Sequence, residues 1–218
     1  MNQKLALLSF AVLTAASAAP TVTVAPFVQA EATYTDSGLK DSTSVYGFGL
    51  DGYEAGIGLT LGAFVNQRHE VSIGTGLTEW TGTPVVTPGF VRVDSKIEQI
   101  PVLLNYRYHL PLDVKERYTI FIGPSVGYIR EKITITDHQL GGLPPALVGS
   151  DSQTDWKFAY GATVGINAKL GAHWTTGASA QVLTVESSDF TTFGGAGPYG
   201  HFDRATRPSF ALSLGYNW

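Results

Sequence analysis

Apolar side chains alternate with small or polar ones along eight stretches of the chain, and no helical periodicity of useful length follows residue 19. The stretches cover residues 23–35, 52–65, 69–80, 96–109, 118–131, 155–170, 173–184 and 207–218. Successive side chains of a strand point to opposite faces, so this period of two predicts eight β-strands. The predicted fold class is therefore all-β.

The connections between these strands alternate in length. Those after the second, fourth and sixth strands are short and cover residues 66–68, 111–117 and 171–172. Those after the first, third, fifth and seventh strands are long and cover residues 36–51, 81–95, 132–154 and 185–206. Short turns at one end and long loops at the other are typical of an antiparallel up-and-down barrel in an outer membrane.

The two faces of each predicted strand differ in bulk. In the second strand, Leu59 and Leu61 alternate with small residues such as Gly58, and the sixth strand repeats this pattern. A soluble barrel would expose these glycines, each of which weakens a strand by about 0.5–1 kcal/mol relative to Ala. A narrow membrane barrel instead turns small residues inward and apolar residues toward lipid. We therefore expect an eight-stranded antiparallel up-and-down transmembrane β-barrel, with Leu59, Val164 and Leu212 facing lipid.

The strand at the carboxyl end alternates as regularly as the others and stops on Trp218. Backbone groups in hydrocarbon must all be paired, so residues 207–218 are expected to pair with residues 23–35 and close the wall. Aromatic residues near the strand ends predict two interface girdles. The short-turn girdle would contain Tyr106, Tyr108, Tyr118, Trp174, Tyr216 and Trp218, and the loop girdle Tyr34, Tyr53, Tyr128 and Trp156.

The first 18 residues predict a cleaved signal peptide. Lys4 gives a charged start, residues 5–16 form an apolar run, and Ala16 and Ala18 supply the small residues that precede a cleavage site. We expect cleavage after Ala18, which leaves residues 19–218 as a single barrel domain in the outer membrane.

Charge and cysteine content narrow the possible functions. The net charge is −4, which argues against a nucleic-acid partner. Charged residues make up only 15% of the chain, which is low for a soluble exported protein. The chain contains no cysteine, so neither disulfides nor thiolate chemistry is available to it.

Two internal stretches and the carboxyl terminus resemble a known family. Residues 100–108 (IPVLLNYRY) and 121–128 (FIGPSVGY) look like the central hairpin of the small porin-like outer-membrane β-barrel family, related in architecture to the OmpX and OmpA barrels. The ending with Tyr216 and Trp218 resembles the carboxy-terminal signal of bacterial outer-membrane barrels. The resemblance implies contact with outer-membrane lipid and lipopolysaccharide, and the barrel-assembly machinery as a partner of the last strand. It implies no reaction.

Two prolines lie inside predicted strands, at positions 101 and 124. Each removes one ladder donor, which a closed barrel cannot leave at a free edge. We expect a bulge or another irregularity at Pro101 and at Pro124.

No motif in the sequence identifies a catalytic, cofactor or metal site. The five histidines, at positions 69, 109, 138, 173 and 201, show no metal-ligand spacing. The pairs Asp137–His138 and His201–Asp203 could in principle join a serine, because outer-membrane acyl hydrolases and transferases are built on eight-stranded barrels. No serine lies in a nucleophile-elbow context.

Five ionisable residues fall on the predicted inner face: Glu31, Glu54, Arg107, Lys157 and Lys169. Inside a narrow lumen such groups need a charged partner or trapped water. A polar plug is favoured over a gated ion path, because eight strands leave too little room for an open channel.

The favoured hypothesis is a non-enzymatic integral outer-membrane barrel of a Gram-negative-type envelope, with a structural role or a surface-interaction role through its long loops. The alternatives are an outer-membrane lipid-modifying enzyme, a narrow porin-like pore, and an exported soluble ligand-binding barrel. Period and composition do not specify a ligand of the loops or an oligomeric state.

Overall fold

The computed structural model describes residues 22–37, 53–82, 85–87, 91–139, 149–191, 199–202 and 204–218. Its strands are β1 (Val24–Asp36), β2 (Tyr53–Val65), β3 (His69–Thr81), β4 (Val85–Thr87), β5 (Val91–Pro111), β6 (Tyr118–Gln139), β7 (Gly149–Lys169), β8 (Trp174–Val185), β9 (Ser188–Thr191), β10 (Tyr199–Phe202) and β11 (Ala205–Asn217). No described segment forms an apolar helix of membrane-spanning length. The predicted signal peptide, residues 1–18, lies outside the described residues.

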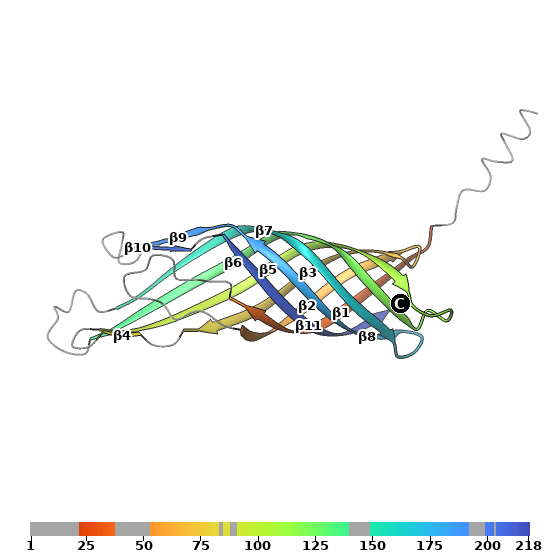
Figure 1. Cartoon of the computed structure of the whole chain (residues 1–218), viewed down its shortest axis with the longest axis horizontal. Helices are drawn as coiled ribbons and strands as arrows, with labels where there is room; N and C mark the ends of the chain where they lie inside the picture. The colour runs from red at the N-terminus through yellow and green to blue at the C-terminus, as the bar shows by residue number, and fades with distance from the viewer. Residues whose placement is uncertain are drawn as a thin grey trace, which may run out of the picture.

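Eight of the strands close into an antiparallel barrel (Figure 1). The sheet runs in the order β3-β2-β1-β11-β8-β7-β6-β5-β4, and a further pairing of β3 with β5 joins its two ends. The short β4 pairs antiparallel with the loop end of β5, whereas β9 and β10 form a separate two-stranded sheet. The predicted eight-stranded up-and-down barrel is confirmed.

The first and last barrel strands form one of the seams. Strand β1 pairs with β11 from Phe27↔Asn217 to Thr35↔Ser209. The backbone N–H of Trp218 also donates to the carbonyl of Pro26, at 3.2 Å. The predicted pairing of these two segments is confirmed, and it holds the terminal tryptophan in place.

The barrel wall turns its apolar face outward. Leu59, Val164 and Leu212 are 44%, 49% and 67% exposed, respectively, whereas polar residues such as Thr60 and Thr163 are buried inside. This confirms the predicted orientation and contradicts a soluble barrel with an apolar interior, because so large an apolar exterior requires lipid.

Strands β5, β6 and β7 are far longer than predicted. They contain 21, 22 and 21 residues, whereas β1, β2, β3 and β11 contain 13 each. The extra length lies at the loop end of the barrel (Figure 1). The predicted loops 81–95, 132–154 and 185–206 are therefore wrong in part, because 85–87, 91–95, 132–139, 149–154, 188–191 and 199–202 are strand.

The extensions differ from the lipid-facing part of the strands because their outer face is polar, and on β6 their inner face is apolar. Within the barrel the apolar residues face outward, but beyond Ile100 on β5 the outward residues are Glu98 and Lys96, and the buried inward residues are Gln99, Ile97 and Ser95. On β6, Ile133 and Ile135 are likewise buried. A strand with a polar outer face and an apolar inner face is suited to water rather than lipid.

The two prolines interrupt the ladder without a bulge. The β3–β5 ladder is paired up to Thr75↔Val102 and again from Thr78↔Gln99, so the register is unchanged across the gap next to Pro101. The β5–β6 ladder skips two pairs next to Pro124 in the same way. The expected irregularity is present at both sites, but the alternative of a bulge is wrong.

Aromatic residues gather near both ends of the apolar band. Tyr34 stacks on Tyr53 at the loop end, with ring centroids 5.2 Å apart. At the short-turn end, Trp174 and Trp218 both pack edge-on against Tyr216, at 5.2 and 5.6 Å. These exposed clusters agree with the predicted interface girdles.

Candidate functional site

The lumen holds most of the ionisable side chains predicted to face inward. Arg107 and Lys157 are buried there, and Glu31 is half-buried. Glu54 and Lys169, by contrast, are exposed at opposite ends of their strands, β2 and β7. The sequence prediction of a polar interior is therefore correct for three of these five residues.

A first group of polar side chains surrounds Glu70 on β3 and is called here the short-turn cluster. Arg107 donates to Glu70 Oε1 at 3.2 Å, and Ser72 donates to the same oxygen at 3.0 Å. The Nε2 atom of His109 lies 2.8 Å from Glu70 Oε2. The carboxylate is thus engaged on both oxygens, as a buried charge requires.

Aromatic rings pack around the short-turn cluster. The ring of His109 lies between Phe64 and Phe121, with centroid distances of 5.0 and 5.3 Å, and Phe64 contacts Phe27 at 5.0 Å. The guanidinium carbon of Arg107 lies 5.0 Å from the centre of the Phe121 ring. Rings and ion pair together fill the barrel near its short turns.

A second group surrounds Glu131 on β6 and is called here the rim cluster. Lys157 from β7 and Gln99 from β5 donate to separate oxygens of Glu131. Arg207 from β11 donates to Glu131 Oε2 at 3.0 Å. Strands β6 and β11 are not neighbours in the sheet, so this contact crosses the lumen.

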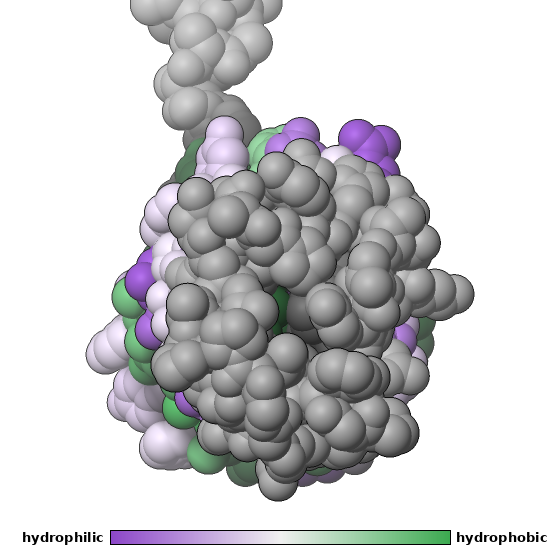
Figure 2. Space-filling view, turned by 90° about the vertical axis from the view of Figure 1, so that its left-hand side faces the viewer, coloured by the Kyte–Doolittle hydropathy of each residue, from purple (hydrophilic) through white to green (hydrophobic). Residues whose placement is uncertain are grey.

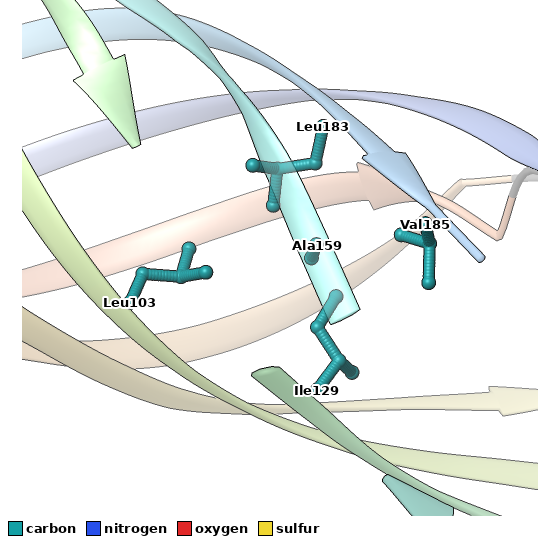
Figure 3. Close-up of a cluster of buried hydrophobic side chains, with 5 residues drawn as sticks. All are labelled: Leu103, Ile129, Ala159, Leu183 and Val185. Carbon is teal, nitrogen blue, oxygen red and sulfur yellow. The ribbon is translucent and has the colours of Figure 1, made fainter. Parts of the chain in front are cut away.

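An apolar cluster lies inside the same part of the barrel. Its side chains come from β5, β6, β7 and β8 and face the interior (Figure 3). The members are Leu103, Ile129, Ala159, Leu183 and Val185. These side chains and the rim cluster occupy the lumen near the loop end.

A cavity of about 110 Å³ occupies part of the lumen. It is lined by residues of both clusters, including Arg107 and Arg207, and by the hydroxyl or amide groups of Thr60, Asn105 and Gln181. By volume it can hold several water molecules, but it is far smaller than the channel of a large porin.

Sequence reasoning missed Glu70, Glu131 and Arg207 as lumen residues. Each has the inward parity of its strand, so the signal was present in the alternation. Their partners could not be inferred, because ion pairs across a barrel depend on strand register and shear.

No catalytic arrangement forms among the described side chains. Ser72 and His109 both engage Glu70, so that imidazole does not face the hydroxyl of the serine. The backbones of Asp137, His138 and His201 lie in β6 and β10, but their side chains and Asp203 lie outside the described part of the structure. Within that part, no three His, Asp or Glu residues form a metal-binding group.

A third set of charges lies on the outer face of the extended sheet and is called here the outer network. Lys96 lies 2.9 Å from Glu79 and 3.1 Å from Glu98, and Lys132 lies 4.0 Å from Glu98. Hydrogen bonds to Glu79 and Glu98 raise the pKa of Lys96 above its ordinary value. The hydrogen bond from Lys96 lowers the pKa of Glu98.

Solved structures of small outer-membrane proteins are similar in fold. Neisserial surface protein A is 11% identical, with a TM-score of 0.54 and coverage of 90% of this chain and 99% of its own. OprG from Pseudomonas aeruginosa is 16% identical, with a TM-score of 0.55 and coverage of 89% and 96%. Ail, the attachment invasion locus protein of Yersinia pestis, in complex with the heparin analogue sucrose octasulfate, is 13% identical, with a TM-score of 0.50 and coverage of 89% and 97%.

One of two sequence comparisons found a match, and that match agrees with the architecture. No curated protein matches the sequence. A family model described as "Outer membrane protein beta-barrel domain" matches residues 5–217, nearly the whole chain. The chain belongs to this family of outer-membrane β-barrels.

Proposed function

We propose that this protein is a closed, non-enzymatic barrel of the outer membrane that presents a polar sheet and long loops to the cell exterior. The observation that carries the proposal is the change of the outer face along β5, β6 and β7 from apolar to polar. The outer face is apolar on the short-turn side of Ile100, Tyr128 and Trp156. On the loop side of these residues it carries charged and polar groups such as Lys96 and Lys132. The sheet therefore continues out of the hydrocarbon.

The protruding end of the barrel is suited to contacts in water. Seen from this end, the described residues that show around the outline of the barrel include both hydrophilic and hydrophobic ones (Figure 2). Loops on a rigid scaffold are the usual place for recognition. The names of two structural neighbours, a surface protein and an attachment protein, agree with a role at the cell surface.

The interior supports a closed barrel rather than a pore. The short-turn cluster fills the lumen near the short turns, the rim cluster and the apolar cluster fill it near the loop end, and the remaining cavity is small. An ion would have to displace buried ion pairs to pass, which is costly in a low-dielectric interior.

Export and assembly complete the proposal. Residues 1–18 would direct the chain out of the cytoplasm, and the strand ending in Tyr216 and Trp218 would engage the barrel-assembly machinery. Outer-membrane lipid and lipopolysaccharide would cover the apolar band. The paired backbone and exposed side chain of Trp218 support a position at the membrane interface.

Cysteine labelling tests the orientation, because the chain has no cysteine of its own. A membrane-impermeant maleimide should label Lys132→Cys on intact cells. Val114→Cys, in an exposed short turn, should be labelled only after the outer membrane is permeabilised, and lipid-facing Leu212→Cys should react poorly in both cases. Labelling of Val114→Cys but not Lys132→Cys on intact cells would reverse the proposed orientation.

Planar-bilayer recording tests the closed lumen. The purified barrel should add no current steps at 100 mV, whereas a large porin in the same bilayer confirms that the assay works. Regular steps from the purified barrel would favour the narrow pore instead. Incubation with labelled lipopolysaccharide tests the enzymatic alternative, since loss or transfer of an acyl chain would contradict a non-enzymatic barrel.

A further inference from the structure

The outer face of β6 changes from apolar to basic just beyond Tyr128. Tyr118 and Tyr128 lie at the two ends of its apolar stretch, and both are about half exposed. A strand of such a barrel rises about 3.3 Å per residue and is tilted by about 40°, so β6 climbs about 25 Å between these tyrosines, which is the usual height of the apolar band. The next outward residue is Arg130. Its backbone therefore lies about 5 Å beyond the band, where lipid headgroups begin.

The cross-strand neighbours of Arg130 offer it no acceptor. Arg130 is half-buried and pairs with Ile100 on one side and with Trp156 on the other. The isoleucine side chain has no polar atom, and the indole of Trp156 only donates. The guanidinium, with its five N–H donors, is thus flanked by two apolar surfaces at the edge of the lipid.

The carboxylate that Arg130 influences is already engaged by the outer network. Glu98 lies 3.1 Å from Lys96 and 4.0 Å from Lys132. The pKa of Glu98 is lowered mainly by the hydrogen bond from Lys96, with smaller electrostatic contributions from Lys132 and then Arg130. Arg130 acts on this carboxylate from beyond ion-pair distance. Among the described side chains it has no hydrogen-bond or ion-pair partner, so its acceptor has to come from outside the chain.

The wall above Arg130 distinguishes between two kinds of lipid. A phospholipid headgroup layer adds only about 5–8 Å to each side of the hydrocarbon, whereas β6 continues for about 25 Å beyond Tyr128 (Figure 1). Its outer face and that of β7 carry hydroxyl groups over this height, on Thr134, Thr136, Ser150, Ser152 and Thr154. Hydroxyl groups can donate to and accept from sugars. The height and the chemistry of this face fit a glycolipid with a sugar chain better than a phospholipid.

We propose that Arg130 binds a phosphate group of lipopolysaccharide in the outer leaflet, beside Trp156, and that the hydroxyl-bearing face above it contacts the core sugars. The proposal rests on the loop end facing the cell exterior, as argued above. A guanidinium can donate two parallel hydrogen bonds to one phosphate, which gives both charge pairing and orientation. The exposed ring of Trp156 offers an apolar surface next to that phosphate for the glucosamine that carries it.

Native mass spectrometry of the folded barrel in a neutral detergent tests the site. The protein is titrated with rough lipopolysaccharide, with the same lipopolysaccharide after enzymatic removal of its phosphates, and with phosphatidylglycerol. The phosphorylated lipopolysaccharide should be retained about tenfold more tightly than the dephosphorylated form. Phosphatidylglycerol should be retained less tightly than phosphorylated lipopolysaccharide, because it has no sugars to meet the hydroxyl-bearing face.

Substitutions locate the contact. Arg130→Gln should lower the affinity for phosphorylated lipopolysaccharide about tenfold and remove the preference for the phosphorylated form. Arg130→Lys should restore part of it, because a lysine keeps the charge but not the paired donors. Arg117→Gln is the matched control, since Arg117 is an exposed arginine at the opposite end of β6, and its affinity should equal that of the parent.

Three outcomes would overturn the proposal. Equal affinity of the parent and Arg130→Gln would mean that the apolar band alone holds the lipid. Equal retention of phosphorylated and dephosphorylated lipopolysaccharide by the parent would show that no phosphate is recognised, and this comparison remains decisive if Arg130→Gln fails to fold. Retention of phosphatidylglycerol as tight as that of lipopolysaccharide would assign the site to a phospholipid. Binding in detergent does not depend on which end of the barrel faces outward, so the cysteine labelling above tests the proposed function separately.

Discussion

The rim cluster and the outer network lie on opposite sides of the same piece of wall. Gln99 pairs with Glu131, and the adjacent Glu98 pairs with Lys132. Inside, the side chain of Glu131 is 1% exposed and contacts Lys157, Arg207 and Gln99; outside, that of Glu98 is 34% exposed and contacts Lys96 and Lys132. Similar ion pairs therefore occupy two very different media within one residue of each other.

The difference shows how burial changes what an ion pair does. An exposed pair is screened by water and contributes little to stability. A buried pair has already lost its hydration, so the removal of one partner leaves a charge that nothing compensates. The inner cluster should thus be sensitive to substitution, and the outer network tolerant of it.

Glu131→Gln should produce the largest effect of the substitutions considered. It removes the carboxylate that Lys157 and Arg207 share in the lumen, at an expected cost of about 3–5 kcal/mol in the free energy of unfolding. Urea titration of the heat-modifiable gel band measures this loss. Glu98→Gln is the matched control, and an equal loss in that variant would contradict the comparison.

Glu70→Gln should be the next most damaging change. The substitution removes the carboxylate partner of a single arginine, Arg107. This arginine keeps its contact with the face of the Phe121 ring. We therefore expect a smaller loss of about 2–3 kcal/mol in the same urea titration. A loss larger than that of Glu131→Gln would show that the number of cations that contact the removed carboxylate does not set the cost.

Pro101→Val should stabilise the barrel by about 0.5–1.5 kcal/mol. The substitution restores a backbone donor next to the interrupted stretch of the β3–β5 ladder. Pro111→Val provides the control, because Pro111 ends its strand and keeps its pairing with Thr119. Equal changes in the two variants would mean that the gap at Pro101 costs nothing.

Disruption of the outer network should have the smallest effect on the stability of the folded barrel. We expect this effect to appear only as a dependence of stability on pH. The pKa of Glu98 is lowered in the folded barrel, so its contribution is present above its ordinary value of about 4.3 and is lost as pH falls through the folded value. The pKa of Lys96 is raised, so its contribution is present below about 10.4 and is lost as pH rises through the folded value.

A Lys96→Gln/Glu98→Gln double variant measures this contribution. The difference in unfolding midpoint between it and the parent should be small, should vanish at both pH extremes, and should shrink in high salt. A difference that persists at pH 3 in high salt would indicate a packing effect instead.

The part of the fold that lies in lipid was predictable from the sequence. Residues such as Leu59 and Val164 mark the outer face at every second position, and this periodicity located all eight barrel strands. The pairing of residues 23–35 with 207–218 followed from the requirement that backbone groups in hydrocarbon be paired.

The strand extensions and the ion pairs across the lumen depended on information that the periodicity of the sequence does not contain. The extension of β6 was taken for a loop because Lys132 faces outward and Ile133 is buried inside, the reverse of the alternation in the lipid-facing part of the strand. The contact between Glu131 and Arg207 joins residues 76 positions apart on strands that are not neighbours, so it depends on the shear of the whole barrel. His138 and His201 lie in segments whose side chains the structure does not describe.

The pairing of β1 with β11 constrains how this protein can be made. The barrel cannot close until β11 has been synthesised and has paired with β1. Strand β1 lies about 180 residues earlier in the chain. Until then, two long edges with unpaired amide groups would invite aggregation. The wall can therefore close only after the last strand has been made, and both edges need protection until then.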